Sequence, residues 1–470
     1  MQSSWRMSRS LLDKISHYSN FPATPVSLRQ MVQFGQNPSP GTLFRASQFL
    51  SEELPIRLAH RVKELNNLPD GLGEMPSIQK VANWYAQSFE EITTLPKLTL
   101  SPDIKDALVR GTRGAPLQLS VATENPSITK GMYSSSPVYG NGNNGARKVA
   151  AAGRYVPENT PNLQGVQGSG SGSSQRPQDV DGYESVHSRY YATIDEGVRW
   201  PPEILEYNKN FTKTLKTIKK RHDPVLTTVA LGINEYKRQR RRTGIDDNIQ
   251  SFLDRFYMSR IGIRMLIGQH VALNEMPCQP DHVGIICTKT NVKELAEEAI
   301  ENARYICQNY YGLFSGPQVQ LVCRDDLNFM YVPGHLSHML FETLKNSMRA
   351  VVESHGVDNE EYPPVKVIVA EGKEDITIKI SDEGGGIPRS AIPLVWTYMY
   401  TTVDKTPDIE EDYDNNDFKA PLAGFGYGLP ISRLYARYFG GDLKLISMEG
   451  YGTDVYLHLN RLSTSSEPLN

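Results

Sequence analysis

The sequence predicts two domains, an N-terminal four-helix bundle that is all-α and a C-terminal α/β sandwich. Three observations support this fold class. The 470 residues exceed what one hydrophobic core usually supports. Apolar side chains recur at helical spacing on both sides of a glycine-rich segment, and the second half contains runs in which apolar and polar residues alternate, as they do in strands.

The composition excludes several classes of protein. With 39% hydrophobic and 22% charged residues, the chain has enough apolar mass for sizeable cores, so it is not fully disordered. Its net charge of −3 gives no global attraction to nucleic acid, and no apolar run is long enough to span a membrane. The four cysteines show no C-x-x-C spacing, which argues against a structural zinc site. We therefore expect no nucleic-acid partner and no membrane span.

The predicted helical domain comprises residues 1–100 and 201–280. Both parts carry apolar stripes at intervals of three and four residues, which are typical of helices packed on helices. These stripes contain Ile78, Val81, Trp84, Tyr85 and Phe89 in the first part, and Ile249, Phe252, Leu253, Phe256, Ile263 and Ile267 in the second.

Residues 101–200 are predicted to be a low-complexity, disordered insertion within the bundle. Residues 111–182 hold 12 glycines, with tracts such as GNGNNG and GSGSGSS. A segment of this composition buries too little apolar surface to build a core. We expect it to be a solvated spacer without a specific function.

Residues 281–462 are predicted to form the α/β sandwich, followed by a short tail at 463–470. Alternating valines at 365, 367 and 369 and isoleucines at 376, 378 and 380 flank a polar turn, which predicts a pair of strands. A second pair is expected where DLKLIS is followed by a turn and by Val455, Leu457 and Leu459.

Three segments of this half contain candidate functional residues. In the first, HMLFETLKNSMRAVVE at 338–353, His338, Glu342 and Asn346 lie four residues apart on one helix face. A solvated helix surface is the ordinary explanation for such a row. In the second, ISDEGGGIP at 380–388, an aspartate ends a strand and glycines follow, which fits either a tight turn or a carboxylate that binds an exocyclic amine.

The third segment, GFGYGLPISRLYARYFGG at 424–441, places a glycine-rich turn before a helix. Pro430 suits the first turn of that helix and Gly440 suits its C-terminal end. Backbone amides at a helix N-terminus favour anions, so this segment suits phosphates. Its spacing matches neither a Rossmann nor a Walker motif.

Taken in order, the three segments resemble the N box and glycine boxes of the Bergerat ATP-binding fold of the GHKL superfamily. More narrowly, HMLFETLKNSMRA, GKEDITIKISDEGGGIP, WTYMYTT and GFGYGLPISRLYARYF resemble the mitochondrial pyruvate dehydrogenase kinases. The helical half is similar to the regulatory bundle of that family in ELPIRLAHRVKELNNLP, TIKKRHDP and FLDRFYMSRIGIRMLIGQH. The resemblance covers about residues 10–100 and 200–462. It implies an ATP-dependent protein serine kinase that phosphorylates and inactivates pyruvate dehydrogenase in the mitochondrial matrix.

The resemblance also implies roles for individual residues. Glu342 matches the general base that acts on the substrate serine, and His338 matches a partner that tunes it. Lys345 and Arg349 would neutralise phosphate charge, and Asn346 matches the magnesium ligand. Further residues implied to bind ATP are Asp382, which matches the adenine-reading aspartate, and Gly384, Gly386, Thr401, Thr402, Gly424, Phe425, Gly426, Tyr427, Gly428, Leu429 and Thr453.

The helical half is implied to hold a pocket for pyruvate-like inhibitors. The residues that match this allosteric pocket are Tyr85, Ser88, Ile218, Arg221, His222, Arg260, Ile263 and Ile267. The acidic segment 403–423 matches the ATP lid of the family. Implied partners are the pyruvate dehydrogenase alpha subunit as substrate, the lipoyl domain of the dihydrolipoyl acetyltransferase core, and a second copy of the chain in a homodimer.

Three alternatives stay open at this point. A branched-chain ketoacid dehydrogenase kinase resembles the chain throughout. A histidine kinase is a more distant alternative, because RHDP at 221–224 is weakly similar to a phospho-acceptor stretch. A nucleotide-gated scaffold without phosphotransfer belongs to a different class. The tail after Leu462 lacks the Asp-Trp pair found near the end of longer family members.

Overall fold

The computed structural model describes residues 5, 7–35, 38–98, 100, 104, 200–240, 246–277, 279–359, 361–401, 426–461 and 464–469. Of the predicted insertion at 101–200, only Ile104 and Trp200 belong to this part. The prediction for that segment and the boundaries of the predicted domains therefore stay predictions.

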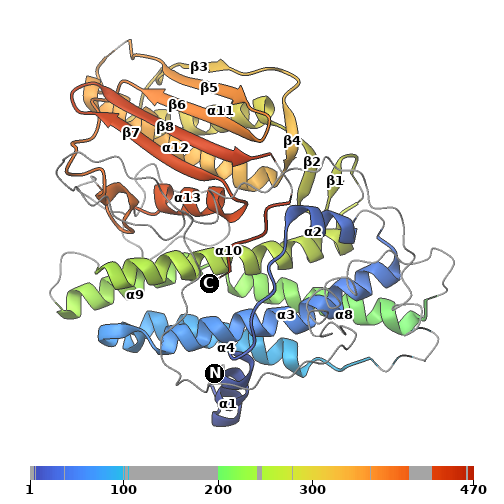
Figure 1. The fold of residues 1–470 in the computed structure, drawn as a ribbon. Coiled ribbons are helices and arrows are strands. Elements are labelled where there is room, and N and C mark those ends of the chain that lie inside the picture. Colours follow the sequence, from blue (N-terminus) through green and yellow to red (C-terminus); the bar gives the residue numbers. More distant parts are fainter. Residues whose placement is uncertain are drawn as a thin grey trace, which may run out of the picture. The chain divides into compact units, whose positions relative to one another are not determined.

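The N-terminal half is helical, as predicted. Its helices are α1 (Arg9–Tyr18), α2 (Leu28–Gly35), α3 (Pro40–Asn66), the 3₁₀ helix η1 (Pro69–Glu74), α4 (Pro76–Thr94), α8 (Pro202–Arg221), α9 (Val225–Arg240) and α10 (Asp247–Glu275). Helix α3 packs against α4, α8 and α10, while α4 also contacts α9 (Figure 1). A bundle of four helices in particular stays a prediction.

These helices form because their apolar residues share one face. In α4, Ile78, Val81, Tyr85 and Phe89 are fully buried, whereas Trp84 is only half-buried. All six apolar residues predicted for α10 are buried as well. Helix ends follow local capping, since Ser39 accepts a hydrogen bond from the Thr42 amide at 3.2 Å directly before Pro40 begins α3.

The C-terminal half combines a mixed five-stranded sheet with helices. The sheet has the order β3 (Val319–Val322), β5 (Val365–Glu371), β6 (Asp375–Asp382), β8 (Gly452–Asn460) and β7 (Asp442–Met448). Strands β3 and β5 are parallel and all other neighbours are antiparallel. A separate small sheet contains β1 (His282–Val283), β2 (Ile286–Asn291) and β4 (Asn328–Tyr331). Both predicted strand pairs are confirmed, with Val367 opposite Ile380 and Leu445 opposite Val455.

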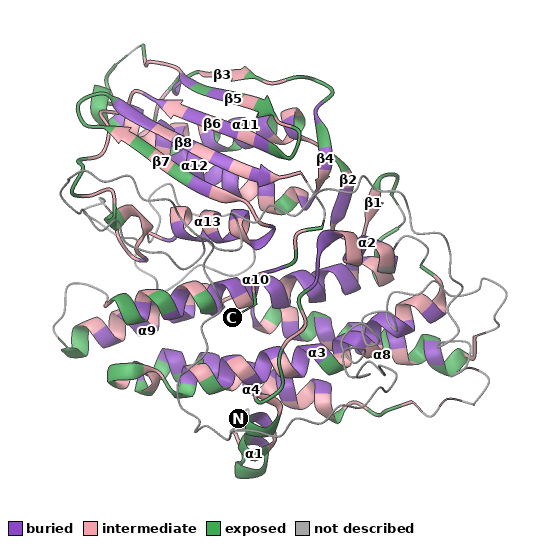
Figure 2. Ribbon diagram, in the orientation of Figure 1, coloured by how far each residue is buried: buried purple, intermediate pink, exposed green. Residues whose placement is uncertain are grey.

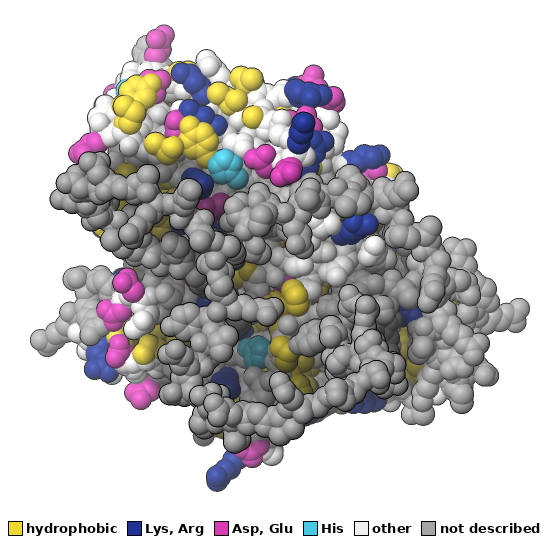
Figure 3. All heavy atoms as spheres, viewed as in Figure 1, with side chains coloured by type: hydrophobic (Ala, Val, Ile, Leu, Met, Phe, Trp, Pro, Cys, Tyr) yellow, Lys and Arg dark blue, Asp and Glu magenta, His cyan; other side chains and the backbone are white. Residues whose placement is uncertain are grey.

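Helices cover one face of the large sheet. They are α11 (Val292–Tyr311), α12 (Pro333–His355) and α13 (Gly428–Tyr438), and the short helix η2 (Leu394–Trp396) lies before α13 in the chain. Figure 2 shows the buried stripes on these helices and on the strands they cover. The opposite face mixes apolar, basic and acidic side chains (Figure 3), and Ile446 and Met448 of β7 are exposed there.

Within the described ranges, no helix is both long and apolar enough to cross a membrane.

The contact between α4 and α9 can be tested at a glycine. A Cβ atom at Gly232 would lie 2.6 Å from Cγ1 of the buried Ile78, so Gly232→Ala should overpack the interface and cost about 1–3 kcal/mol of unfolding free energy. Gly268 of α10 is the matched control, because its Cβ would meet Ile285 at an ordinary 3.5 Å. Gly268→Ala should be neutral or stabilise by up to about 1 kcal/mol. Equal effects in urea denaturation would contradict this packing.

Candidate active site

Helix α12 carries Glu342, which is predicted to be the general base, and Asn346, which is predicted to bind magnesium. Pro333 occupies its first turn, and the helix ends at Gly356, which has a positive φ of 88°. Its apolar stripe is completely buried and consists of Leu336, Leu340, Leu344, Met348 and Val351. The helix predicted over 338–353 is therefore confirmed.

Glu342 and Lys345 form a buried ion pair on α12. Their side chains are 9% and 2% exposed, and Lys345 Nζ donates to Glu342 Oε1 at 2.7 Å. The Lys345 ammonium also lies 5.3 Å from the centre of the Phe341 ring. A solvated helix face, the ordinary explanation for this row of residues, is therefore wrong for Glu342 and Lys345. Burial of two charges is costly without a task for them, which favours a functional role.

The N-terminus of α13 meets this ion pair. A Cβ atom at Gly428, the first residue of α13, would overlap Oε2 of Glu342. The carboxylate thus lies against the backbone at the positive end of the helix, where negative charge is stabilised. Gly426 has a φ of 75° and lies so close to the Tyr400 carbonyl that no side chain fits. Thr402, Gly424 and Phe425 lie outside the described residues, as does the predicted lid at 403–423.

Asp382 lies at the end of β6, as predicted, and is buried. Its Oδ1 accepts hydrogen bonds from the Gly384 amide at 3.1 Å and from the Thr453 amide at 3.2 Å. Burial raises the pKa of Asp382, while hydrogen bonds from Ser347 and from these two amides oppose the rise. The structure therefore brings Asp382 and Thr453 together and holds both beside α12.

Gly384 and Gly386 have packing reasons to be glycine. A side chain at Gly384 would overlap Ala350 of α12, and one at Gly386, where φ is 71°, would overlap the Met448 carbonyl. These close approaches bring the turn after β6 against α12 and the end of β7. Gly385 and Gly386 have positive φ angles of 79° and 71°, which glycine allows, and an adenine contact by Gly384 and Gly386 stays a prediction.

The remaining candidates on α12 make separate contacts. His338 packs edge-on against Tyr435 of α13, with ring centres 5.2 Å apart. Arg349 forms an ion pair with Glu353 at 2.7 Å. Asn346 is half-buried one helical turn after Glu342, which leaves its amide near the edge of the site.

The structure also describes three other residues that were predicted to bind ATP, namely Thr401, Tyr427 and Leu429. Of these, only Tyr427 is buried.

Helix α10 holds the residues that flank the glycine-rich turn. The Tyr398 hydroxyl donates to Asp254 at 2.7 Å, and the Tyr398 amide donates to the Gln250 side chain at 3.2 Å. Tyr257 packs against the rings of both Tyr398 and Tyr427. Sequence reasoning missed these contacts, because tyrosines at 257, 398 and 427 carry no local signal that they meet.

A second cluster lies in the helical half and unites five of the predicted allosteric residues. Tyr85 stacks on His222 with ring centres 4.5 Å apart, and His222 Nε2 lies 3.0 Å from Ser88 Oγ. Arg221 donates to Ser88 at 2.9 Å and pairs with Glu91. The positive charge of Arg260 acts on both Tyr85 and His222. The other predicted members are buried in neighbouring helices and are Ile218, Ile263 and Ile267.

The electrostatics of this cluster keep His222 neutral. Burial lowers the pKa of His222 to about 3, with smaller contributions from the charges of Arg260 and Arg221. Burial also raises the pKa of Tyr85 to about 12, so its hydroxyl stays protonated. Neutral hydrogen-bonding groups surrounded by arginines are chemically suited to a small anion.

Known proteins share both halves of this arrangement. Residues 331–463 match the family described as "Histidine kinase-, DNA gyrase B-, and HSP90-like ATPase", so the α/β half is an ATP-binding domain of the GHKL class. Residues 25–287 match the family described as "Mitochondrial branched-chain alpha-ketoacid dehydrogenase kinase". The predicted class of nucleotide-binding domain is thereby confirmed.

Full-length relatives narrow the assignment. The chain is 46% identical to "[Pyruvate dehydrogenase (acetyl-transferring)] kinase, mitochondrial" of Schizosaccharomyces pombe, over 98% of this chain and 99% of the relative. It is 39% identical to the Arabidopsis thaliana protein of the same name, over 98% and 97%, and 35% identical to human isozyme 3, over 98% and 89%. The chain belongs to the mitochondrial pyruvate dehydrogenase kinase family.

The buried histidine makes stability depend on pH. His222 titrates at about 3 when folded and at about 6.5 when unfolded. Below about pH 6.5 the unfolded chain binds a proton that the folded chain does not, so acidification destabilises the fold. From pH 7.5 to 5.5, His222 should account for a loss of about 1 kcal/mol. His222→Gln should remove this part of the pH-dependent loss of unfolding free energy, as measured by urea unfolding at the two pH values. If the variant loses as much stability on acidification as the wild type, His222 is not neutral in the fold.

Proposed function

We propose that this chain is an ATP-dependent protein serine kinase that phosphorylates and inactivates the pyruvate dehydrogenase component of the pyruvate dehydrogenase complex. One observation carries the proposal: the buried carboxylate of Glu342 lies against the N-terminus of α13 in an ATP-binding domain. A base and a phosphate-binding helix end therefore meet at one place. Names of the relatives supply the substrate class.

ATP would bind between α12, the end of β6 and α13. Asp382, whose Oδ1 accepts from the Thr453 amide, would accept a hydrogen bond from the adenine amine. The backbone amides at the start of α13 would hold phosphate oxygens. Lys345 and Arg349 would offset phosphate charge, although in the structure each is paired with a glutamate of α12.

The residues present fit a magnesium ion that arrives with ATP. In the described part of the chain, no group of three or more histidine, cysteine or acidic side chains is arranged to hold a metal ion by itself. The half-buried Asn346 offers one amide oxygen, and Mg²⁺ typically takes one or two protein ligands together with phosphates and water. Bound there, the ion would supply neutralisation of phosphate charge.

Glu342 would act as the general base. As the serine oxygen bonds to the γ-phosphorus, the bond from that phosphorus to the ADP oxygen breaks, and the hydroxyl proton passes to the Glu342 carboxylate. The Glu342 carboxylate lies 2.7 Å from the Lys345 ammonium and against the N-terminus of α13. His338, one helical turn before Glu342, would tune its basicity.

The helical cluster would bind a small carboxylate effector of the pyruvate type. Support comes from the three arginines 221, 260 and 264, whose charges all act on His222. The further partners we propose are the pyruvate dehydrogenase alpha subunit, the lipoyl domain of the dihydrolipoyl acetyltransferase core and a second copy of the chain, and the proposed compartment is the mitochondrial matrix.

A branched-chain ketoacid dehydrogenase is the alternative substrate, because the family matched by residues 25–287 carries that description. Parallel assays with the two dehydrogenases and radiolabelled ATP decide between them. Acid-stable phosphoserine on the pyruvate dehydrogenase alpha subunit is the expected product. Preferential labelling of the branched-chain enzyme would overturn the proposed substrate and leave the kinase assignment intact.

Asp382→Asn should weaken ATP binding at least about tenfold. The neutral side chain of the variant would accept hydrogen bonds from the Gly384 and Thr453 backbone amides, and from adenine, more weakly than the carboxylate does. Isothermal titration of ATP measures the change. Asp375→Asn, at the exposed opposite end of β6, is the matched control and should bind ATP normally. Undiminished affinity in Asp382→Asn would remove the adenine role.

Glu342→Gln should still bind ATP, while phosphoryl transfer falls about a hundredfold to ten-thousandfold, because general-base assistance is lost. Single-turnover phosphorylation at saturating ATP measures this rate. Glu301→Gln is the matched control, since Glu301 and Arg304 form an exposed ion pair with the same three-residue spacing on α11. A Glu342→Gln rate above about a tenth of wild type would rule out the base.

A further inference from the structure

The C-terminal segment 464–469 is attached to the N-terminal segment that precedes α2. Ser466 and Ser27 form an antiparallel β-bridge, and the Glu467 amide donates to the Val26 carbonyl at 3.2 Å. In return, the Val26 amide donates to the Glu467 carboxylate at 3.2 Å. This reciprocal pairing places the Glu467 side chain in the interior, where the residue is only 4% exposed.

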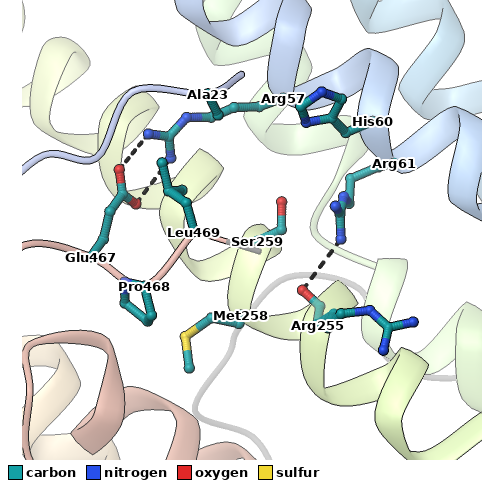
Figure 4. Close-up of a pocket in the computed structure, with 10 residues that line it drawn as sticks. All are labelled: Ala23, Arg57, His60, Arg61, Arg255, Met258, Ser259, Glu467, Pro468 and Leu469. Carbon is teal, nitrogen blue, oxygen red and sulfur yellow. Dashed lines mark hydrogen bonds and ion pairs between the residues drawn. The ribbon is translucent and has the colours of Figure 1, made fainter. Parts of the chain in front are cut away.

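The Glu467 carboxylate joins the helical half to α13. Arg57 of α3 binds it through two nitrogens, one of them 3.0 Å from Oε2 (Figure 4). The hydroxyl of Tyr438, the last residue of α13, donates to the same Oε2 at 2.6 Å. Burial raises the pKa of Tyr438 well above its usual value, so this hydroxyl keeps its proton and remains a donor.

Helix α10 also reaches this carboxylate. Gly262 lies so close that a Cβ atom there would come within 2.8 Å of Glu467 Oε2. Gly262 lies between Arg260 and Ile263, two of the predicted allosteric residues. The Glu467 carboxylate therefore contacts α10, which carries Arg260 of the cluster around His222, and α13, which would hold ATP phosphates.

The cavity beside this network is too small for an organic ligand. It measures about 30 Å³ and is lined by Arg57, Arg61, Arg255 and Leu469, among others. That volume is enough for only a few water molecules. The side chains of the C-terminal segment 464–469 therefore occupy the interface between α3 and α10 (Figure 4). The segment is a structural part of that interface.

We propose that Glu467 is a positioning residue for nucleotide binding. By holding Tyr438, it sets the orientation of α13 against α3 and α10. The eleven residues of α13 form one rigid rod about 15 Å long, so a shift at Tyr438 moves Gly428 at the other end. The inference rests on the proposed function, in which ATP phosphates bind at the N-terminus of α13.

Three single variants of the full chain, and a double variant that combines the first two, test this role. Tyr438→Phe removes only the hydroxyl that α13 donates, and Glu467→Gln removes the charge that Arg57 and Tyr438 share. Glu275→Gln is the control, because Glu275 forms an exposed ion pair with Lys216 at the end of α10. Calorimetry with ATP and magnesium, well below each melting temperature, gives the dissociation constants.

Tyr438→Phe and Glu467→Gln should each weaken ATP binding by at least about fivefold relative to wild type. Coupling between two sites in a protein typically changes affinity by this amount or more. The double variant should bind ATP no more weakly than Glu467→Gln alone, since both changes remove the same interaction between Tyr438 and Glu467. Glu275→Gln should stay within about twofold.

A purely structural role gives a different pattern. Lower melting temperatures with ATP affinities within about twofold of wild type would overturn the proposal. Should Glu467→Gln fail to fold, Tyr438→Phe alone decides, because it leaves the pair of Arg57 and Glu467 in place. Failure of the wild-type chain to bind ATP would instead overturn the proposed function.

Discussion

The Glu342 carboxylate is held between the Lys345 ammonium and the first residue of α13. Lys345 approaches it to 2.7 Å, and the backbone of Gly428 comes so close that any side chain there would overlap it. Glycine at position 428 therefore allows α13 to approach α12 this closely at the Glu342 carboxylate. Because both charges of the pair are buried, they depend on each other, and loss of either leaves an uncompensated charge. The candidate base, the helix end proposed to bind phosphate and the close contact of the two helices all depend on this constraint.

Helix α10 links this site to the helical half. Its 29 residues carry Asp254 and Tyr257, which contact the residues flanking the glycine-rich turn. About one to two turns later it carries Arg260 of the cluster around His222, and then Gly262 beside Glu467. A continuous hydrogen-bonded helix resists bending over such short distances, so these contacts share one rigid frame. This shared frame physically connects the proposed effector cluster with the proposed nucleotide site.

Local patterns in the sequence predicted the elements, and the resemblance of three motifs to a known family predicted the class of chemistry. Three- and four-residue spacing in α4 and α10 follows from burying one helix face, and alternation in β5 and β6 follows from the pleat of a strand. Pro430 and Gly440 marked α13 because capping acts within a few residues. Glu342, Asn346 and Asp382 could be selected because their motifs are contiguous in the chain.

The sequence by itself determined which residues form helices and strands and which carry the motifs, since those signals act over a few residues. Only the tertiary structure decided that Glu342 and Lys345 are buried, because Gly428 of α13, which lies against Glu342, belongs to a distant part of the chain. The same holds for Arg57 and Glu467, which are 410 positions apart. Such pairs follow from how helices and sheet pack, and an isolated arginine or glutamate has no local feature that identifies its partner.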